Sequence, residues 1–353
     1  MYRLFILCFC SFILLACNRK SNPTATNAKD LYQSQEIDLE QTLTTIALGS
    51  CNRQDLPQDM WNHILAQEPQ LWVWLGDNIY GDSEDMSVMK AKYMQQKYAP
   101  EYVAFRRELP IIGTWDDHDF GVNDGGKEFS KRAESQALML DFLDVPKDAP
   151  VRSQAGVYQS YTFGPKEKQV KIILLDSRYH RDATVDNPDP KARYLPNETG
   201  TILGEAQWQW LEQELINSEA QVHIIANGIQ VIPEDHGYEK WANFPKERQR
   251  LIDLLRKHSI SRPILVSGDR HIAEVSKLVF PYYDYPIYEL TTSGLTHSYD
   301  KVGEEPNRHR VSKLIGELNF GIIRIDWAAG DAPGVRVEVR GKNDKIHTAV
   351  DLD

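Results

Sequence analysis

The sequence predicts an α/β fold, and two observations support it. Six short apolar runs are typical of strands buried on both faces, and segments with helical periodicity, such as 205–215 and 245–255, lie between them. The six runs span 44–48, 71–75, 110–114, 171–175, 222–226 and 263–266. Strands that alternate with amphipathic helices form a sheet whose active site lies beyond the carboxyl ends of the strands. We therefore expect the polar residues that follow these strands to gather at one edge.

Three later apolar runs predict an antiparallel portion that closes the sheet. They span 287–292, 320–326 and 335–339, and turn residues separate the last two. No internal repeat or second linker interrupts the chain after about residue 42. We therefore expect one domain, large enough to carry an active site, over residues 42–353.

The first 41 residues have the composition of an export and tethering segment. A basic start, a short apolar run and a small residue before Cys17 predict a signal peptide over residues 1–16. The stretch Leu14-Leu15-Ala16-Cys17 is similar to a bacterial lipobox, which implies lipidation of Cys17. The polar residues that follow predict a flexible stalk over residues 17–41. We expect an exported protein, lipid-anchored to a bacterial membrane and facing the periplasm or cell exterior. Asparagine rather than aspartate follows the lipidated cysteine at position 18, which under ordinary lipoprotein sorting favours the outer membrane.

The chain is acidic, with a formal net charge of −11. An acidic protein repels nucleic acid and anionic lipid headgroups at long range, so any anionic ligand must be captured by local cations. We therefore expect no nucleic acid binding, and membrane contact only through the N-terminal lipid.

Cysteine use singles out Cys51. Cys8 and Cys10 leave with the signal peptide and Cys17 is the lipidation site, so Cys51 has no disulfide partner in an oxidising compartment. An unpaired thiol there is either buried and inert or coordinated to a metal.

Potential metal ligands follow several of the predicted strands. They are Cys51, Asp77, Tyr80, Asp116, Asp117, His118, Asp119, Asp269 and His271. Carboxylates a few ångströms apart raise one another's pKa, and metal ions remove that conflict. We therefore expect a bimetal site with one bridging carboxylate, the arrangement that suits attack on a phosphorus ester.

A thiolate beside a phenolate indicates which metals to expect. A phenolate is a hard, strongly donating anion that suits Fe³⁺, whereas Mg²⁺ and Ca²⁺ are normally bound by carboxylate, carbonyl and water oxygens. Cys51, Asp77, Tyr80, Asp117 and Asp269 together provide five negative charges. One trivalent and one divalent ion would balance them.

Each of these features also has an ordinary alternative when taken alone. The stretch LGDNIYGD over residues 75–82 could be a solvated turn, and Cys51 could be a packed small hydrophobic residue. Residues 117–119 could cap a helix, Asp269 could pair with its neighbour Arg270, and His271 could be structural. Their coincidence after successive strands favours the metal site.

Five motifs follow one another along the chain: Gly49-Ser50-Cys51, Leu75-Gly76-Asp77-Asn78-Ile79-Tyr80, Thr114-Trp115-Asp116-Asp117-His118-Asp119, Leu175-Asp176-Ser177-Arg178 and Ser267-Gly268-Asp269-Arg270-His271. In this order they resemble the motifs of the PhoD-like metallophosphatases, also called the alkaline phosphatase D family. The segment 241–248 is similar to the family's tryptophan, proline and arginine signature. The resemblance implies the α/β/β/α sandwich of the metallophosphoesterases, with the metal site at the carboxyl ends of the strands.

The resemblance also implies ligands for two metal ions, Fe³⁺ and a divalent ion that in this family is often Ca²⁺. A thiolate, a phenolate and an imidazole would hold the first ion, and carboxylates would hold the second. Asp77 would bridge the two ions. The ligands of the first ion would be Cys51, Tyr80 and His271, and those of the second Asp117 and Asp269, with Asn227 and Asn123 as weaker candidates.

Two further residues receive roles from the resemblance. His118 would contact phosphate and help to protonate the leaving oxygen, and Arg178 would clamp a phosphate oxygen through its guanidinium fork. The implied function is hydrolysis of small phosphate esters, as a phosphomonoesterase or phosphodiesterase, by a metal-bound hydroxide. Ester preference would depend on the pocket mouth, where we place residues 82–89 and 188–199.

The alternative function belongs to another class. It is an inactive relative that keeps the fold and acts as a surface module for a ligand or partner. The retention of the candidate ligands together with His118 argues against that loss of catalysis.

Overall fold

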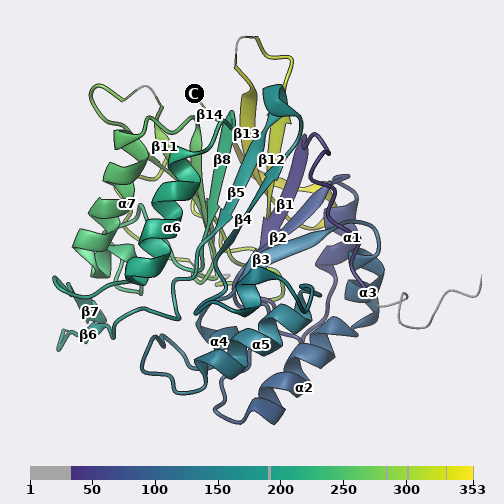
Figure 1. The fold of residues 1–353 in the computed structure, drawn as a ribbon, viewed down its shortest axis with the longest axis vertical. Coiled ribbons are helices and arrows are strands. Elements are labelled where there is room, and N and C mark those ends of the chain that lie inside the picture. The colour runs from purple at the N-terminus through teal and green to yellow at the C-terminus, as the bar shows by residue number, and fades with distance from the viewer. Residues whose placement is uncertain (1–32, 190–191, 284, 300–301, 331, 353) are drawn as a thin grey trace, which may run out of the picture.

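Two six-stranded sheets form the centre of the computed structural model, which describes residues 33–189, 192–283, 285–299, 302–330 and 332–352 (Figure 1). The first sheet has the order β14-β13-β12-β1-β2-β3, and the second has the order β10-β11-β9-β8-β5-β4. The strands of the first sheet are β1 (Thr45–Gly49), β2 (Leu71–Leu75), β3 (Ile111–Thr114), β12 (Phe320–Asp326), β13 (Gly334–Arg340) and β14 (Ile346–Leu352). Those of the second are β4 (Gln159–Phe163), β5 (Val170–Leu174), β8 (Val222–Ala226), β9 (Pro263–Ser267), β10 (Ala273–Leu278) and β11 (Ile287–Thr292).

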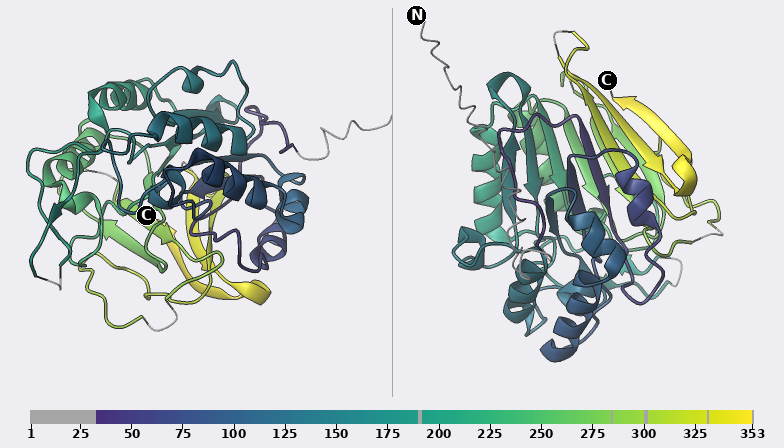
Figure 2. Two further views of the ribbon diagram at one scale, coloured as in Figure 1. Left: turned by 90° about the horizontal axis from the view of Figure 1, so that it is seen from below. Right: turned by 90° about the vertical axis from the view of Figure 1, so that its right-hand side faces the viewer.

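Helices cover the outer face of each sheet, so the molecule has four layers (Figure 2). The first sheet is covered by α1 (Met60–Leu65), α2 (Met86–Lys97), α3 (Pro100–Arg106), α4 (Asp117–Phe120) and α5 (Arg132–Phe142). The second is covered by α6 (Gly204–Ile216) and α7 (Pro245–Lys257). Short 3₁₀ turns occur at Pro150–Arg152, Lys166–Lys168, Trp241–Asn243 and Lys342–Asp344, and a small hairpin pairs β6 (Val185–Asp186) with β7 (Tyr194–Leu195).

Alternation along the strands assigns their side chains to three cores. In β1, Ile46 and Leu48 point into the core between the sheets, whereas Ala47 packs among the helices of the outer layer. In β5, Ile172 belongs to the core between the sheets and Ile173 to the core beneath α6 and α7. Burial of both faces explains why these strands are continuously apolar. The α/β class and the sandwich are confirmed.

Parallel pairing brings the carboxyl ends of the main strands to one edge. β1, β2 and β3 run parallel in the first sheet, and β5, β8 and β9 run parallel in the second. β12 and β13 are antiparallel, as predicted. The expectation for 287–292 is partly wrong, because β11 pairs parallel with β9 and antiparallel with β10. The sequence showed that 287–292 is a strand but not which neighbour it would meet.

The segment before β1 is in contact with the rest of the domain. Residues 33–41 lie against the domain: Gln35 N donates to Arg106 O (3.2 Å) and Gly164 N donates to Leu39 O (2.8 Å). The signal peptide, Cys17 and the stalk up to residue 32 lie outside the described residues. Within the described part of the chain, no helix combines the length and apolarity needed to cross a membrane.

Candidate metal centre

Three groups of side chains at the shared strand edge could each hold a metal ion. In each group the potential ligand atoms lie within 4.8 Å of one another. The groups are Cys51, Asp77 and His271; Asp77, Asp117 and His118; and Asp116, Asp117 and Asp269. Because neighbouring groups share Asp77 or Asp117, the donors form one continuous cluster. The first sheet supplies the residues after β1, β2 and β3, and the second supplies those after β9.

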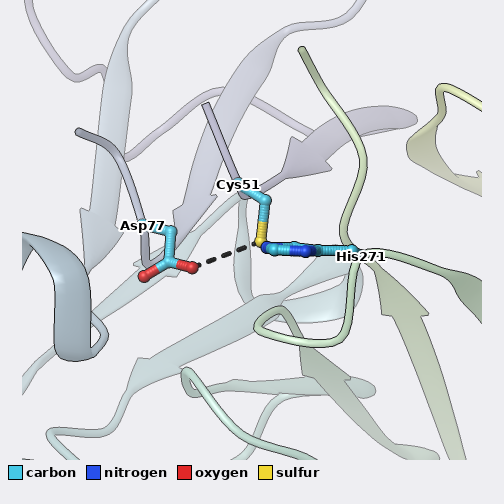
Figure 3. A group of neighbouring side chains, drawn as sticks. All are labelled: Cys51, Asp77 and His271. Carbon is cyan, nitrogen blue, oxygen red and sulfur yellow. Dashed lines mark hydrogen bonds between the residues drawn. The ribbon is translucent and has the colours of Figure 1, made fainter. Parts of the chain in front are cut away.

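The first part of the cluster surrounds the Cys51 sulfur. Its Sγ lies 3.3 Å from Asp77 Oδ2, and Figure 3 shows the sulfur beside both the Asp77 carboxylate and the His271 ring. The Tyr80 hydroxyl donates to Asp77 Oδ2 (3.2 Å) and lies 2.8 Å from His271 Nε2. Ser293 Oγ is 3.0 Å from the sulfur and accepts from the His271 backbone N–H (2.7 Å). Thiol, carboxyl, phenol and imidazole therefore converge on one position.

The second part of the cluster is carboxylate-rich. Asp117 Oδ2 accepts from the Asp124 backbone N–H (2.7 Å), and Asp116 Oδ2 is buried without a hydrogen-bond partner in the described residues. Burial raises the pKa of Asp117, but Arg178 and His118 outweigh it and lower the pKa to about 2. Asp117 is therefore ionised, and the unpartnered oxygen of Asp116 beside it could act as a ligand for a cation.

The loops that carry the cluster have unusual backbone conformations. Cys51, Asp77, Asp269 and His271 all have positive φ, at 59°, 51°, 65° and 54°. Positive φ is sterically unfavourable for residues with a Cβ and is concentrated at functional sites. Four of the expected metal ligands therefore hold conformations that the surrounding structure must enforce.

Glycines allow the loops to approach closely. A Cβ on Gly228 would lie 2.0 Å from Asp116 Oδ1, and a Cβ on Gly268 would lie 2.6 Å from Leu75 O. Gly76 has φ +93°, and a Cβ there would meet Asp116 Cβ at 2.4 Å. The absent side chains let both sheets bring their strand ends to the same cluster.

The protonation states fit a metal centre. Burial raises the pKa of Cys51 to about 11, and burial together with neighbouring negative charges raises the pKa of Asp77 and Tyr80 well above their usual values. Burial and the charges of Asp116 and Asp117 do the same for Asp269. Such acids ionise when a cation lies among them. Burial lowers the pKa of His271 to about 3, which leaves the neutral imidazole that binds metals.

His118, a member of the second group, has an acidic partner. Its Nδ1 lies 2.7 Å from Asp82 Oδ1, and its backbone N–H points to Asp77 Oδ1 (3.4 Å). Burial lowers the pKa of His118, but Asp77, Asp117 and Asp82 outweigh it and raise the pKa to about 11. Asp82 thus fixes the orientation of the ring.

Arg178 is more deeply placed than a phosphate clamp requires. It has no exposed surface, its Nε donates to Asp116 Oδ1 (2.7 Å), and its Nη1 lies 2.8 Å from Glu239 Oε2. Arg181 holds the other oxygen of Glu239 at 3.1 Å. The guanidinium of Arg178 therefore joins Asp116 to Glu239 beneath the cluster.

The two asparagines named as weaker candidates differ in position. Asn227 is buried, and its Oδ1 accepts from Trp241 Nε1 (2.9 Å). Asn123 is exposed, in the turn after α4. The structure gathers Cys51, Asp77, Tyr80, Asp117, His118, Asp269 and His271, while Asn123 lies at the surface.

Sequence reasoning missed how several residues organise the site. Asp119, expected as a potential metal ligand, instead accepts from the backbone N–H groups of Asp77 (3.1 Å) and Asp116 (2.8 Å), so it ties two ligand loops together. Asp82 and Glu239 contact the expected functional residues directly. For Asp82 a signal existed, because it closes the same motif as Asp77; nothing near Glu239 in the sequence connects it to Arg178.

Comparison with known proteins identifies the family of this chain. The family model described as PhoD-like phosphatase matches residues 46–326. Alkaline phosphatase D of Bacillus subtilis (strain 168) is 23% identical over 275 residues, which cover 66% of this chain and 47% of that protein. The chain thus spans about half the length of this curated relative.

Solved structures share the fold at low identity. The structure of PhoD has a TM-score of 0.72 and 16% identity, over 91% of this chain and 72% of the other. A dimetal phosphatase from Danio rerio has a TM-score of 0.53 and 14% identity, over 89% of this chain and all of the other. GAP50, an inner membrane complex anchor of Plasmodium, has a TM-score of 0.54 and 11% identity, over 89% of each chain. The family match confirms the resemblance inferred from the motifs, and this chain belongs to the PhoD-like phosphatase family.

Proposed function

We propose that this protein is a metal-dependent phosphatase that hydrolyses phosphate esters at the strand-end cluster. The observation that carries the proposal is the convergence of Cys51, Tyr80, Asp77 and His271 next to the carboxylates after β3 and β9. Family membership supports phosphate esters as substrates. The likeness to GAP50 shows that the fold alone does not decide between enzyme and anchor, so the donor set carries the choice.

The donors divide into two sets. Cys51, Tyr80 and His271 would hold one ion, which we propose to be Fe³⁺ because phenolate and thiolate accompany imidazole there. Asp117, Asp269 and the free oxygen of Asp116 would hold a divalent ion such as Ca²⁺. Asp77 belongs to groups on both sides and would bridge the two ions. Bound metal ions supply positive charge that lowers the pKa of water and neutralises phosphoryl oxygens.

The protein's own residues supply orientation and a proton. His118 stands at the edge of the cluster with its Nδ1 held by Asp82, so its Nε2 is free to carry a proton to the leaving alcohol oxygen. Arg178 is fully buried and donates to Asp116, so we propose that it holds this carboxylate in position. Loops fixed by Asp119 keep these groups in place before the substrate binds.

We also propose that the enzyme is tethered outside the cytoplasm by a lipid on Cys17. The signal-like start and the lipobox-like stretch before Cys17 support this location. Mass spectrometry of the protein from native membranes should find the N-terminal peptide beginning at a diacylated Cys17. An intact N-terminus at Met1 would contradict the tether and leave the phosphatase proposal untouched.

Elemental analysis, a visible spectrum and hydrolysis assays on protein purified without chelator test the phosphatase proposal. We expect iron, a divalent metal and hydrolysis of 4-nitrophenyl phosphate or bis(4-nitrophenyl) phosphate. Asp77→Asn should lose both bound metal and activity, whereas Asp253→Asn, which removes an exposed carboxylate on α7, should keep both. Metal-free wild-type protein without hydrolysis would contradict the proposal and favour a binding module.

A further inference from the structure

The β6–β7 hairpin reaches the metal centre from outside both sheets. Figure 1 shows it below α6 and α7, away from the sandwich. At its return strand, the Tyr194 hydroxyl donates to the Asp124 carboxylate, and the Asp124 backbone N–H donates to Asp117 Oδ2. The Arg193 backbone N–H donates to Gly237 O (3.0 Å). The hairpin thus contacts Asp124, which in turn contacts the expected metal ligand Asp117.

Arg193 and Tyr238 form a stack at this position. The Arg193 guanidinium lies 5.0 Å from the centre of the Tyr238 ring, and the guanidinium of Arg270 lies 4.0 Å from the same ring. Arg270 directly follows Asp269 in the chain. Tyr238 therefore connects the exposed arginine of the hairpin to the loop that carries a metal-ligand candidate.

An exposed aromatic side chain, Tyr299, lies beside the expected metal ligand His271. Its ring lies 5.2 Å from that of His271, and the side chain is 47% exposed. Arg270, which lies over the same Tyr238 ring as Arg193, directly precedes His271 in the chain. The Arg193–Tyr238–Arg270 stack therefore ends beside the metal cluster.

Arg193 differs from two other arginines near the site, Arg270 and Arg53, in having no ion-pair partner among the described residues. Arg270 is buried and both oxygens of Glu305 lie 2.7 Å from its Nη2. Arg53 is paired with Asp55 at 2.7 Å. Arg193 is exposed, and among the described residues no carboxylate lies within ion-pair distance of it. The chain has a net charge of −11, so a guanidinium without a described carboxylate partner is available to bind an anion from solution.

A stacked guanidinium is well suited to bind an anion. The aromatic face of Tyr238 restricts the plane of the Arg193 side chain, so less conformational freedom is lost when its N–H groups meet an anion. Carboxylate and phosphate groups accept two parallel hydrogen bonds from such a fork. Neutral alcohols gain no comparable interaction.

We propose that Arg193, held by Tyr238, binds a second anionic group of the substrate. The preferred substrates are then phosphate esters whose alcohol portion carries a carboxylate or a further phosphate. This inference rests on the proposed phosphatase function, since the scissile phosphate must occupy the metal centre. It assigns the hairpin a role in substrate selection.

Titration calorimetry with phosphonates, whose carbon–phosphorus bond resists hydrolysis, tests the inference on the metal-loaded full chain. Phosphonoacetate, 3-phosphonopropionate and 4-phosphonobutyrate are each compared with the alkyl phosphonate in which a methyl group replaces the carboxylate. The three lengths sample different spacings between the two anions. We expect the carboxylate of the best-fitting length to strengthen binding about tenfold, with a smaller gain at high salt.

Variants separate the local contact from overall charge. Arg193→Gln should abolish the preference for the carboxylate, and Arg193→Glu should reverse it. Arg107→Gln removes an exposed positive charge at the end of α3 and should leave the preference intact. An unchanged preference in Arg193→Gln, or no preference in the wild type, would overturn this inference and leave the phosphatase proposal intact. If neither phosphonate of any pair binds, the phosphatase proposal fails and the inference fails with it.

Discussion

Replacement of Arg178 by methionine should destabilise the protein strongly, and more at high pH than at low pH. Arg178 compensates three carboxylates, with contacts of 2.7 Å to Asp116, 2.8 Å to Glu239 and 3.9 Å to Asp117, and the exposed fraction of the four side chains is 0–3%. Methionine fills similar volume but carries no charge. Asp116 would then be buried without a cationic partner, while Glu239 would keep Arg181 at 3.1 Å.

The magnitude follows from the burial of these groups. Removal of one partner from a buried ion pair typically costs about 3–5 kcal/mol, because the remaining charge is left uncompensated. For comparison, Lys257→Met breaks an exposed pair with Glu212, whose contact is 3.2 Å, and should change the free energy of unfolding little, because solvent screens that pair. The two variants remove the same charge and differ in burial.

The sign of the pH dependence comes from the carboxyl groups. Burial raises the pKa of Asp116 to about 6 and that of Glu239 to about 7, although Arg178 opposes both shifts. The folded state therefore binds more protons than the unfolded state between about pH 4 and pH 7, and the free energy of unfolding falls as pH rises through that window. Without Arg178 both pKa values rise further, so the fall extends to higher pH. Each additional unit costs about 1.4 kcal/mol per group once the pH exceeds the new value.

Urea unfolding, followed by tryptophan fluorescence at pH 5 and pH 8 with a chelator present, measures these differences. We expect the loss in Arg178→Met to be larger at pH 8, and Asp116→Asn in the same background to recover part of it, because it removes the carboxylate left without a cationic partner. Equal losses at both pH values, or a loss no larger than that of Lys257→Met, would refute the reasoning. If Arg178→Lys is stable yet no longer binds propylphosphonate in the metal-loaded protein, Arg178 contacts phosphate and the sequence-based role is the correct one.

Three further perturbations address the metal centre. Tyr80→Phe should bleach a ferric–phenolate band in the visible spectrum without loss of the fold; an unchanged band would show that Tyr80 is not a ligand. Asp82→Asn should lower kcat about 10- to 100-fold at constant metal content, because the 2.7 Å contact orients His118, and full activity would contradict that role. Gly228→Ala should abolish metal uptake by forcing a Cβ to within 2.0 Å of Asp116 Oδ1, as elemental analysis would show, and normal metal content would mean that the loops can separate.

Local sequence information was sufficient for the elements and for most of the cluster. The runs at 71–75 and 222–226 coincide with β2 and β8, because strands buried on both faces require continuous apolar residues. Asp77 and Asp117 could be placed near each other because parallel neighbouring strands end at the same edge. Ligand chemistry is a property of residue type, so the sequence also indicated a metal site.

Pairing and burial depended on the folded molecule. The apolar pattern of 287–292 is the same whether its neighbour runs parallel or antiparallel, so only the assembled second sheet decided the direction of β11. The pattern also does not reveal that three of the six strand ends come from each sheet. The motif that contains Asp77 indicated Asp82 as a site residue, but its contact with His118 depends on how the two loops fold together.

By itself, the sequence determined which side chains could bind metal and that they would meet at strand ends, since both follow from residue chemistry and short-range periodicity. The tertiary structure decided the roles that depend on neighbours distant in the chain. Arg178 is buried because Glu239, 61 positions later in the sequence, closes over it, and Arg193 is free because no described carboxylate approaches it. Residue type fixes charge and hydrogen-bonding capacity, but solvent exposure and the identity of the partner arise only when distant segments pack together.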